Sequence, residues 1–355
     1  MSNPVEVRSK LELQEDRIVV PVDNIVELVE HIFIDLGCSP ASARQIAEHL
    51  ASSNLYGMES HGLMRTLQYA DQFESGYMRA DVDPAVRIND RGAKIVDGNG
   101  GHGIPAMYLA TEEACREATE KGVSVIAICN VGHTGRLGAF TELAAERGHL
   151  CIMFGGGGRD KWRQVAPHGG RKAMLPTNPY TIGIPGGERG PVVLDFATSK
   201  VAGGWIYAAR SAGATLPDNV LMNPEGRVSR DPEDYFRGGA IMPAGGAMGY
   251  TLALAAEIMA EGMLGPTTTE GGWLMITIDT TRYRDAPTMT RVAEEILDEL
   301  RNCPPAQGFD RVEIPGERER EHRDRTVDQG IAMPAQTWTQ IQALSSRLKA
   351  GATRK

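Results

Sequence analysis

The sequence has little of what marks secreted, membrane-spanning or nucleic-acid-binding proteins. Its five cysteines are an odd number, widely spaced and without a Cys-x-x-Cys pair, which argues against a disulfide framework and against a zinc knuckle. No run of roughly eighteen or more apolar residues occurs, so we expect no segment that spans a membrane. The net charge of −9 provides no basic face for phosphates, which argues against a nucleic-acid partner. The eight histidines include no His-x-x-x-His pair, and we predict no metal site.

Length and composition favour a globular protein of the α/β class. The 355 residues suffice for two domains or for one large domain with an insertion. Forty-one glycines, twenty prolines and 41% apolar residues are typical of a folded, loop-rich chain rather than a disordered one. The first ten residues are polar and lack the apolar core of a signal peptide, so we expect a cytoplasmic protein.

The stretch from Gly57 to Tyr69 places a hydroxyl, an imidazole and a guanidinium within six positions, at Ser60, His61 and Arg65. If the stretch is helical, His61 and Arg65 share one face and lie about 5–6 Å apart at Cβ. A proton donor would then stand beside an anchor for a carboxylate. The same spacing fits a surface helix that Ser60 caps at its N-terminus, and the spacing alone does not separate the two interpretations.

Three helices are predicted in the first third of the chain. Residues 23–36 carry one apolar face, and residues 39–56 follow with Ser39 as N-cap and Pro40 at the first helical position. A further helix covers residues 106–121. These assignments place the Ser60 and His61 pair at a junction after the second helix, where functional side chains are common.

A Gly-x-Gly-x-x-Gly match at Gly98–Gly103 raises the question of a dinucleotide fingerprint. The strand ahead of it is short, and the next strand ends in Asn130 rather than in the acidic residue that would hold a ribose. We therefore favour an ordinary tight turn.

Residues 123–154 read as strand, loop, helix and strand, which predicts a crossover unit with a parallel pair of strands. Two loops follow the carboxyl ends of these strands: one carries His133, and the other is the glycine run Gly155–Gly158. Binding sites in such sheets lie at that edge. The bare N–H groups of the glycine run suit a phosphate, and a flexible surface turn is the alternative.

A group of basic residues follows the glycine run in an otherwise acidic chain and favours an anionic ligand such as a pyrophosphate or a 2′-phosphate. The group comprises Arg159, Lys161, Arg163, Arg171 and Lys172.

Three later segments carry further expectations. Asp195 ends a strand and either orients a histidine or caps the following helix, with the spacing favouring the cap. Residues 249–263 are apolar nearly all round, so we expect a deeply buried helix. The charged run at residues 317–325 is by default a solvated face, and a segment near the site is the alternative.

Taken together, the motifs resemble those of the type-2 malate/L-lactate dehydrogenase family over about residues 20–348. The matching segments, in order, are ESHGLMR, DGNGGHG, VGHTG, VAPHGG, TNP, LDFATS, GGAMGYTLAL and PGER. The family includes ureidoglycolate and sulfolactate dehydrogenases, diketogulonate reductases and cyclic imine-2-carboxylate reductases.

The resemblance implies an α/β fold that is not a Rossmann domain. A mixed sheet would form a cofactor domain over residues 86–284, and a helical domain would be built from residues 1–85 with 285–355. A homodimer is implied as well.

By resemblance, His61 is the proton donor and acceptor, Ser60 is its hydroxyl partner and Arg65 grips the substrate carboxylate. His133 and Asp195 match further residues of the active site. The positions that match cofactor-lining and site-lining segments are Gly155, Gly156, Gly157, Thr177, Asn178, Gly316, Glu317 and Arg318.

The implied activity is hydride transfer between NAD or NADP and a 2-hydroxy or 2-oxo acid, with reduction of a cyclic imine-2-carboxylate by NADPH as the alternative. An imidazole can exchange the proton that this chemistry needs near neutral pH. The basic residues favour NADP slightly. The chain departs from the family at Thr134, where an aromatic residue is common, and at Ala247 and Met248, where a His-Lys pair is common. These changes point to a bulkier or less anionic substrate than malate.

Two rival functions remain at this point. A hydrolase using Ser60 and His61 is disfavoured, because adjacent helical residues point about 100° apart. A cofactor-binding protein without turnover is conceivable because the His-Lys pair is lost.

Overall fold

The computed structural model describes residues 16–211, 213–267 and 269–352. The polar N-terminal segment on which the expectation of a cytoplasmic protein depended lies outside the described residues. The helices are α1 (Val22–Asp35), α2 (Pro40–Leu55), α3 (Arg65–Glu74), α4 (Gly103–Lys121), α5 (Gly138–Glu146), α6 (Gly203–Ser211), α7 (Glu233–Phe236), α8 (Ala247–Glu257), α9 (Ala286–Arg301), α10 (Glu317–Thr326) and α11 (Ala335–Ala352). Shorter turns are the 3-10 helices η1 (Glu59–His61) and η3 (Thr280–Arg282) and the π-helix η2 (Ile258–Leu264).

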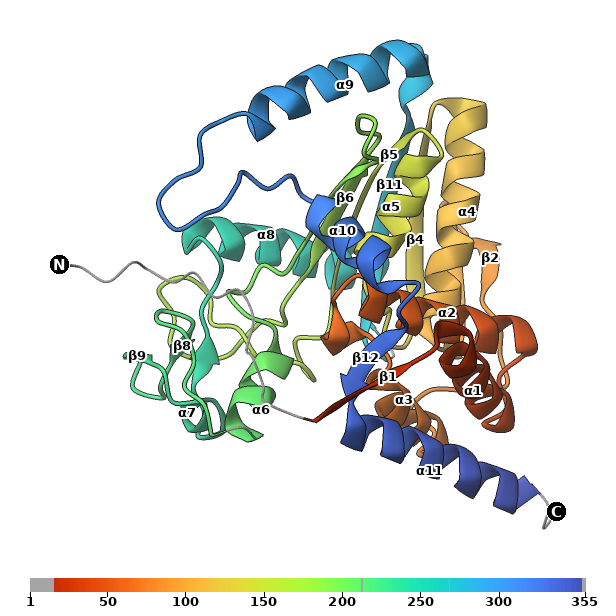
Figure 1. Ribbon diagram of the computed structural model, residues 1–355, viewed down its shortest axis with the longest axis vertical. Helices are drawn as coiled ribbons and strands as arrows, with labels where there is room; N and C mark the ends of the chain where they lie inside the picture. Colours follow the sequence, from red (N-terminus) through yellow and green to blue (C-terminus); the bar gives the residue numbers. More distant parts are fainter. Residues whose placement is uncertain (1–15, 212, 268, 353–355) are drawn as a thin grey trace.

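A mixed seven-stranded sheet forms the centre of the molecule (Figure 1). Its strands, in spatial order, are β2 (Ala85–Ile88), β3 (Lys94–Gly101), β4 (Val123–Val131), β11 (Gly271–Asp279), β5 (His149–Gly156), β6 (Tyr180–Ile184) and β7 (Val192–Phe196). Among these pairings β3 with β4 is parallel, and the others are antiparallel. The sheet confirms the predicted α/β class.

Two small sheets accompany the large one. β1 (Arg17–Val20) pairs with β12 (Ile331–Pro334), so a strand near each end of the described chain lies beside the other. β8 (Leu221–Met222) lies between β10 (Ala240–Ile241) and β9 (Val228–Ser229).

Local capping chemistry fixes the start of α2 where the sequence predicts, whereas α1 has no side-chain cap at its N-terminus. The Ser39 side chain accepts a hydrogen bond from the amide of Ser42 at 3.2 Å, and Pro40 opens α2. Gly57, with φ of 75°, follows the end of α2, and Gly122, with φ of 88°, ends α4.

The glycine match at residues 98–103 has a packing explanation. A Cβ on Gly98 would lie 2.5 Å from a Val131 methyl, and one on Gly103 would lie 2.5 Å from the Gly132 carbonyl oxygen. These glycines therefore let β3 and the start of α4 approach the end of β4 closely.

The predicted parallel pairing of β4 and β5 is wrong. β11 lies between them and hydrogen-bonds to both in antiparallel register, with Met275 opposite Ile126 on one side and Met153 on the other. The crossover through α5 leaves one strand position open, and an apolar strand from much later in the chain occupies it.

The two largest apolar cores lie in different parts of the molecule. One joins α1, α2 and α3 to α11 and includes Ile25, Phe33, Leu50 and Ile341. The other lies between the sheet and α4 and α5. Figure 1 shows α11 beside α1 and α3 at the bottom of the view, away from the sheet.

The predicted deep burial of residues 249–263 is also wrong. Leu254 is 40% exposed, Ile258 62% and Met263 60%. One side of α8 and η2 packs against β5 and β11, while the other carries apolar side chains into solvent.

Candidate active site

The site lies where three strand ends meet. The His133 loop follows β4 and the glycine run ends β5, as the sequence predicts, while the antiparallel β11 begins at the same edge. The segment with Ser60, His61 and Arg65 reaches this edge from α2 and α3.

His61 is half-buried on η1, and its Nδ1 lies 3.0 Å from the Ser60 hydroxyl oxygen. The expectation that a hydrogen bond between these adjacent side chains would be awkward is therefore wrong. A 3-10 turn replaces the assumed α-helix, so the argument from α-helical geometry does not apply. The hydroxyl occupies Nδ1 and leaves Nε2 for other chemistry.

His61 and Arg65 do not share a helix face, because an extended residue, Gly62, separates η1 from α3. The Asn54 side chain on α2 fixes this break by accepting the Leu63 amide at 2.7 Å. A Cβ on Gly62 would lie 1.9 Å from the same Asn54 oxygen.

Arg65 is nevertheless held beside Ser60. Its Nε donates to the Ser60 carbonyl at 2.6 Å, and its Nη1 donates to the Gln68 side chain. Both bonds are local, so the guanidinium is fixed in position before any ligand binds.

His133 joins His61 in the site. Their rings stack with centroids 5.8 Å apart. The Tyr69 hydroxyl lies 2.6 Å from His133 Nδ1, which also accepts the Gly135 amide at 3.1 Å. Because Nδ1 accepts, the neutral ring carries its proton on Nε2.

Both rings are neutral at pH 7. Burial, reinforced by the cations of Arg65 and Arg136, lowers the pKa of His61 to about 4. Burial first, and then Arg65, lowers the pKa of His133 well below its usual range. A neutral imidazole is ready to accept a proton.

Two further histidines support the site, and sequence reasoning missed both. His49 on α2 accepts the Arg136 amide at 2.9 Å and so anchors the loop that carries His133. His102 caps α4 by accepting the Ile104 amide at 3.1 Å, and its ring meets that of Tyr69 with centroids 4.3 Å apart. The cap position of His102 ahead of a helix was the available signal.

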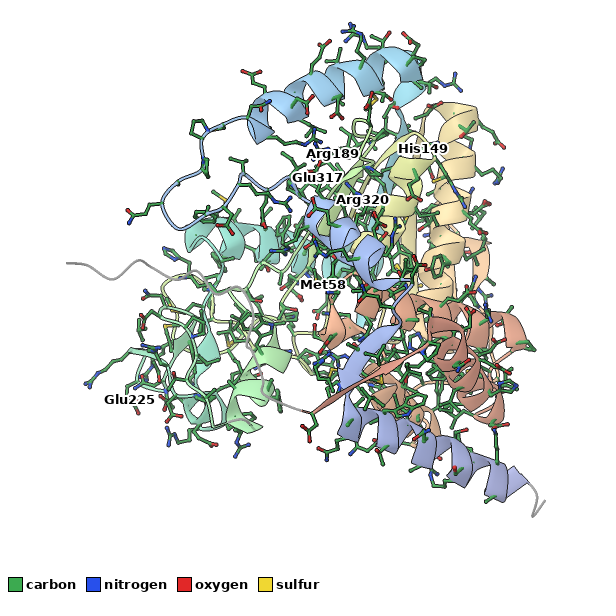
Figure 2. All side chains as sticks on the ribbon, in the orientation of Figure 1. Met58, His149, Arg189, Glu225, Glu317 and Arg320 are labelled. Carbon is green, nitrogen blue, oxygen red and sulfur yellow. The ribbon has the colours of Figure 1, made fainter. Side chains whose placement is uncertain are left out.

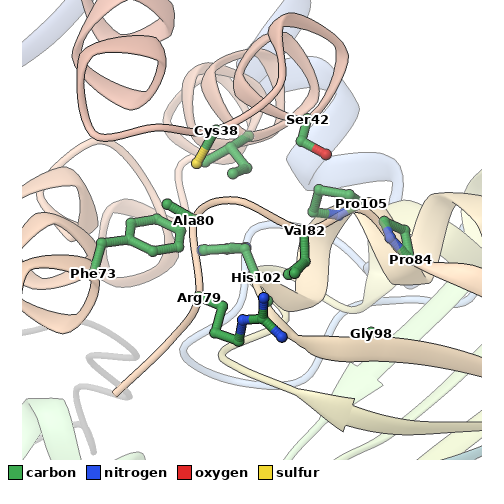
Figure 3. Close-up of a pocket in the computed structure, with 12 residues that line it drawn as sticks. Cys38, Ser42, Phe73, Arg79, Ala80, Val82, Pro84, Gly98, His102 and Pro105 are labelled. Atoms are coloured by element: carbon green, nitrogen blue, oxygen red, sulfur yellow. The ribbon is translucent and has the colours of Figure 1, made fainter. Parts of the chain in front are cut away.

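His102 also lines the small pocket in Figure 3, together with Phe73, Arg79 and Cys38. Its Nε2 has no hydrogen-bond partner among the described residues. Burial lowers the pKa of His102 to about 3, so this ring too is neutral.

Asp195 caps a helix, but not the one that follows it. Its carboxylate accepts the amide of Gly138, the first residue of α5, at 2.7 Å. Removal from water raises the pKa of the Asp195 carboxyl. The Gly138 amide and Arg136 oppose this rise. The sequence predicted that Asp195 either orients a histidine or caps the helix that follows it. In the structure its carboxylate binds the first amide of α5 instead.

The glycine run packs against the protein itself. A Cβ on Gly155 would lie 2.2 Å from the Trp273 ring. The Gly157 amide donates to the Glu257 carboxylate at 3.0 Å, and the Asn178 side-chain amide donates to the same oxygen at 2.6 Å. The N–H of Gly157 is thus already committed to an anion.

This edge also holds buried polar atoms without partners in the described part of the chain: Trp273 Nε1, Asn178 Oδ1 and Glu257 Oε2. One is a donor and two are acceptors. A carboxamide, which has both donors and an acceptor, matches that set. Gly156 belongs to the same packing, since a Cβ there would lie 2.8 Å from the Ala256 carbonyl oxygen.

The remaining predicted cofactor residues make internal bonds. The Thr177 carbonyl accepts the amide and the hydroxyl of Thr198, at 3.0 and 2.8 Å. Gly316, with φ of 93°, precedes α10, where Glu317 pairs with Arg301 and Arg318 pairs with Glu319 at 2.7 Å.

The charged helix α10 is not simply a solvated face. Arg320 is 8% exposed, donates to the Arg189 carbonyl at 3.2 Å and lies 3.5 Å from Glu142 on α5. Figure 2 shows Arg320 and Glu317 on α10 beside Arg189. Among the basic residues after the glycine run, Arg159 pairs with Glu261 at 2.7 Å and Arg163 with Asp160 at 3.2 Å.

Within the described ranges, no three His, Cys, Asp or Glu residues are placed to share a metal ion. In the same ranges, no helix is both long and apolar enough to cross a bilayer.

The chain is similar to known proteins over nearly its whole length. A profile of the malate/L-lactate dehydrogenase family matches residues 20–342. The Delta(1)-pyrroline-2-carboxylate/Delta(1)-piperideine-2-carboxylate reductase of Pseudomonas putida is 30% identical, covering 89% of this chain and 94% of its own. The L-sulfolactate dehydrogenase of Methanothermobacter thermautotrophicus is 29% identical, covering 91% and 95%.

Solved structures agree with these sequence matches. Malate dehydrogenase from Entamoeba histolytica superposes with a TM-score of 0.87 at 25% identity, covering 94% of this chain and 99% of that one. The chain is an oxidoreductase and belongs to the malate/L-lactate dehydrogenase family.

Proposed function

We propose that the enzyme transfers a hydride between NAD or NADP and a small 2-hydroxy or 2-oxo acid, or the related cyclic imine acid. The observation that carries the proposal is a neutral imidazole, His61, with its Nδ1 on the Ser60 hydroxyl and a fixed guanidinium, Arg65, beside it. Relatives named for malate, for sulfolactate and for cyclic imine carboxylates are consistent with this range of substrates.

The side chains take distinct roles in this proposal. In the oxidative direction, His61 accepts the hydroxyl proton while the carbon loses its hydride; in the reductive direction, His61 returns the proton to oxygen or nitrogen. The Ser60 hydroxyl keeps the ring oriented, and Arg65 holds the substrate carboxylate. His133, stacked on His61, closes the other side of the site.

The residues at the strand edge fit a nicotinamide cofactor. Trp273 Nε1 and Asn178 Oδ1 are buried, unpartnered in the described chain, and complementary to a carboxamide. Gly155–Gly157, Thr177 and Gly316–Arg318 would line the remainder of the cofactor site. When bound, the cofactor donates or accepts the hydride. The basic residues near Arg159 support NADP, although two of them already pair with carboxylates.

The proposal includes a division into residues 1–85 with 285–355, and 86–284, with the cofactor held outside a Rossmann fold. The paired β1 and β12, and the predominance of antiparallel strands, support it. We place the enzyme in the cytoplasm, where its five free cysteines would stay reduced.

A second copy of the chain is proposed to cover the apolar side of α8 and η2. Met248 is 73% exposed there, beside Leu254, Ile258 and Met263. Replacing Ile258 with aspartate should convert a dimer into a monomer in sedimentation velocity, because it puts a charge into that surface. Val228→Asp, at an equally open apolar position on β9, is the control. A wild-type monomer would contradict the proposal.

The catalytic roles are tested by turnover with NADH and NADPH over a panel of 2-oxo and cyclic imino acids. His61→Ala should lower kcat about 100-fold or more, because it removes the proton donor. Arg65→Ala should lower kcat/KM about ten- to hundredfold by removing a charge-assisted contact. His168→Ala, at an exposed histidine, is the control. Turnover of His61→Ala within about threefold of wild type would contradict the assignment.

A further inference from the structure

Glu270 lies at the active edge of the sheet, immediately before β11. Its amide donates to the Val131 carbonyl at 3.3 Å, two residues ahead of His133. The neighbouring Thr269 is also fixed there, since its hydroxyl donates to the same Val131 oxygen and its own carbonyl accepts from Tyr77 at 3.4 Å. The backbone therefore holds Glu270 beside the loop that carries His133.

The Glu270 side chain faces α3, the helix that begins with Arg65. Its Oε1 is buried and has no hydrogen-bond partner among the described residues. The Gln72 side chain on α3 lies against the Glu270 carboxylate, and Gln72 Oε1 is likewise buried without a partner in those residues. Each of these two acceptor atoms lacks a donor, although the Gln72 side chain hydrogen-bonds to the Glu270 carboxylate. A buried acceptor without a donor is costly in a folded protein unless a ligand or water supplies one.

The charges around Glu270 connect it to the substrate anchor. Burial raises the pKa of the Glu270 carboxyl, and Arg65, Gln72 and Lys161 oppose that rise, in decreasing order. The Arg65 guanidinium is thus near enough to Glu270 to stabilise its charged form. A ligand whose carboxylate binds Arg65 would therefore lie near Glu270.

We propose that Glu270 is a specificity-determining residue, and that it selects a ligand with an N–H donor next to its carboxylate, such as the protonated form of a cyclic imine acid or its amino acid product. Two buried acceptors without partners in the described chain, Glu270 Oε1 and Gln72 Oε1, would receive that donor. This inference rests on the proposed function, because it takes Arg65 as the carboxylate anchor.

The same carboxylate disfavours a dicarboxylate. A second carboxylate group on malate or on a sulfonated analogue would bring like charge toward Glu270 and would leave both acceptors without a donor. A site built to hydrogen-bond an N–H group discriminates strongly against an analogue that lacks it. Ala247 and Met248 stand where a His-Lys pair is common in the family. The loss of these cationic groups also disfavours a second carboxylate on the substrate.

The test compares two flat five-membered ring acids that differ at one atom. Pyrrole-2-carboxylate carries a ring N–H, and furan-2-carboxylate carries a ring oxygen. Their binding to the full-length enzyme is measured by isothermal titration calorimetry, alone and with NAD⁺ or NADP⁺. The wild type should bind the pyrrole acid about tenfold or more tightly than the furan acid.

Glu270→Ala should reduce that preference to within about twofold, whereas Glu270→Gln, which keeps an acceptor, should retain part of it. Glu225→Ala, at an exposed glutamate far from α3 in Figure 2, should leave it unchanged. Equal binding by the wild type, or a preference that survives in Glu270→Ala, would overturn the proposal. So would a Glu270→Ala variant in which only cofactor affinity falls, since the donor would then be the cofactor's carboxamide.

This readout does not depend on turnover. If the N–H preference holds and Arg65→Ala weakens both acids equally, Glu270 is confirmed even where a substrate panel fails. If the panel shows turnover but the two acids bind alike, the proposed function stands and the role of Glu270 falls.

Discussion

Two buried polar regions adjoin α2, and they treat charge in opposite ways. In the site, four histidines are kept neutral by burial. On the side toward α5 and α10, Glu142 is paired with Arg136 at 3.2 Å and with Arg320 at 3.5 Å, with the Tyr56 hydroxyl at 3.3 Å. One region holds neutral imidazole rings, while the other pairs a carboxylate with two guanidinium groups of the chain.

The comparison teaches that the two regions divide the work of the site. Arg136 follows the His133 loop directly, and its guanidinium lies 4.1 Å from the Tyr56 ring centroid on α2. The ion network therefore fixes the end of the loop that carries His133.

The largest effect is expected from breaking the ion network. Glu142→Ala leaves two buried guanidinium groups without their shared carboxylate, which should cost about 3–5 kcal/mol in the free energy of unfolding. Urea denaturation at pH 7 measures it. Glu295→Ala, which breaks an exposed pair with Arg291, should cost less than about 1 kcal/mol. A similar small loss for both variants would show that the ion pairs of Glu142 do not stabilise the packing of α2 against α5 and α10.

A second effect, which appears only when the pH is lowered, is expected from the neutral histidines. Their pKa is near 6.5 in the unfolded chain but about 4 for His61 and about 3 for His102 in the fold. Between these values the unfolded state binds more protons, so the free energy of unfolding falls as the pH falls. The limiting slope is about 1.4 kcal/mol per pH unit for each histidine.

Urea denaturation between pH 7 and pH 4 measures this slope. His102→Asn keeps an acceptor at the cap of α4 and should reduce the slope by one proton. His168→Asn, at an exposed position, should leave it unchanged. If His102→Asn matched the wild type at every pH, the pKa of His102 would not be lowered in the fold.

Local signals in the sequence were enough for the start of α2 and the end of α4. Ser39 with Pro40, and Gly122 after α4, act within one turn, so their consequences could be read directly. The α/β class and the edge that carries His133 were also predictable, because the order of helices, strands and loops constrains them. The family resemblance added the role of His61.

Contacts between distant segments were not predictable in the same way. Whether His61 and Arg65 share a helix was decided by Asn54, which binds the Leu63 amide from another helix. The proximity of Glu270 to α3 depends on the register of β11 with β4, which no local pattern contains. The exposure of apolar side chains on α8 depends on its packing against β5 on one side only, which no local pattern contains.

The central position of β11 has a consequence for how the chain is made. β4 and β5 are complete by residue 156, yet the strand that joins them begins at Gly271. During synthesis, two apolar strands therefore wait with unpaired edges until more than one hundred further residues have emerged. Such edges invite pairing with other chains, and closure over this separation is slow. The nascent enzyme should thus be most prone to aggregation, and most in need of chaperones, just before its eleventh strand appears.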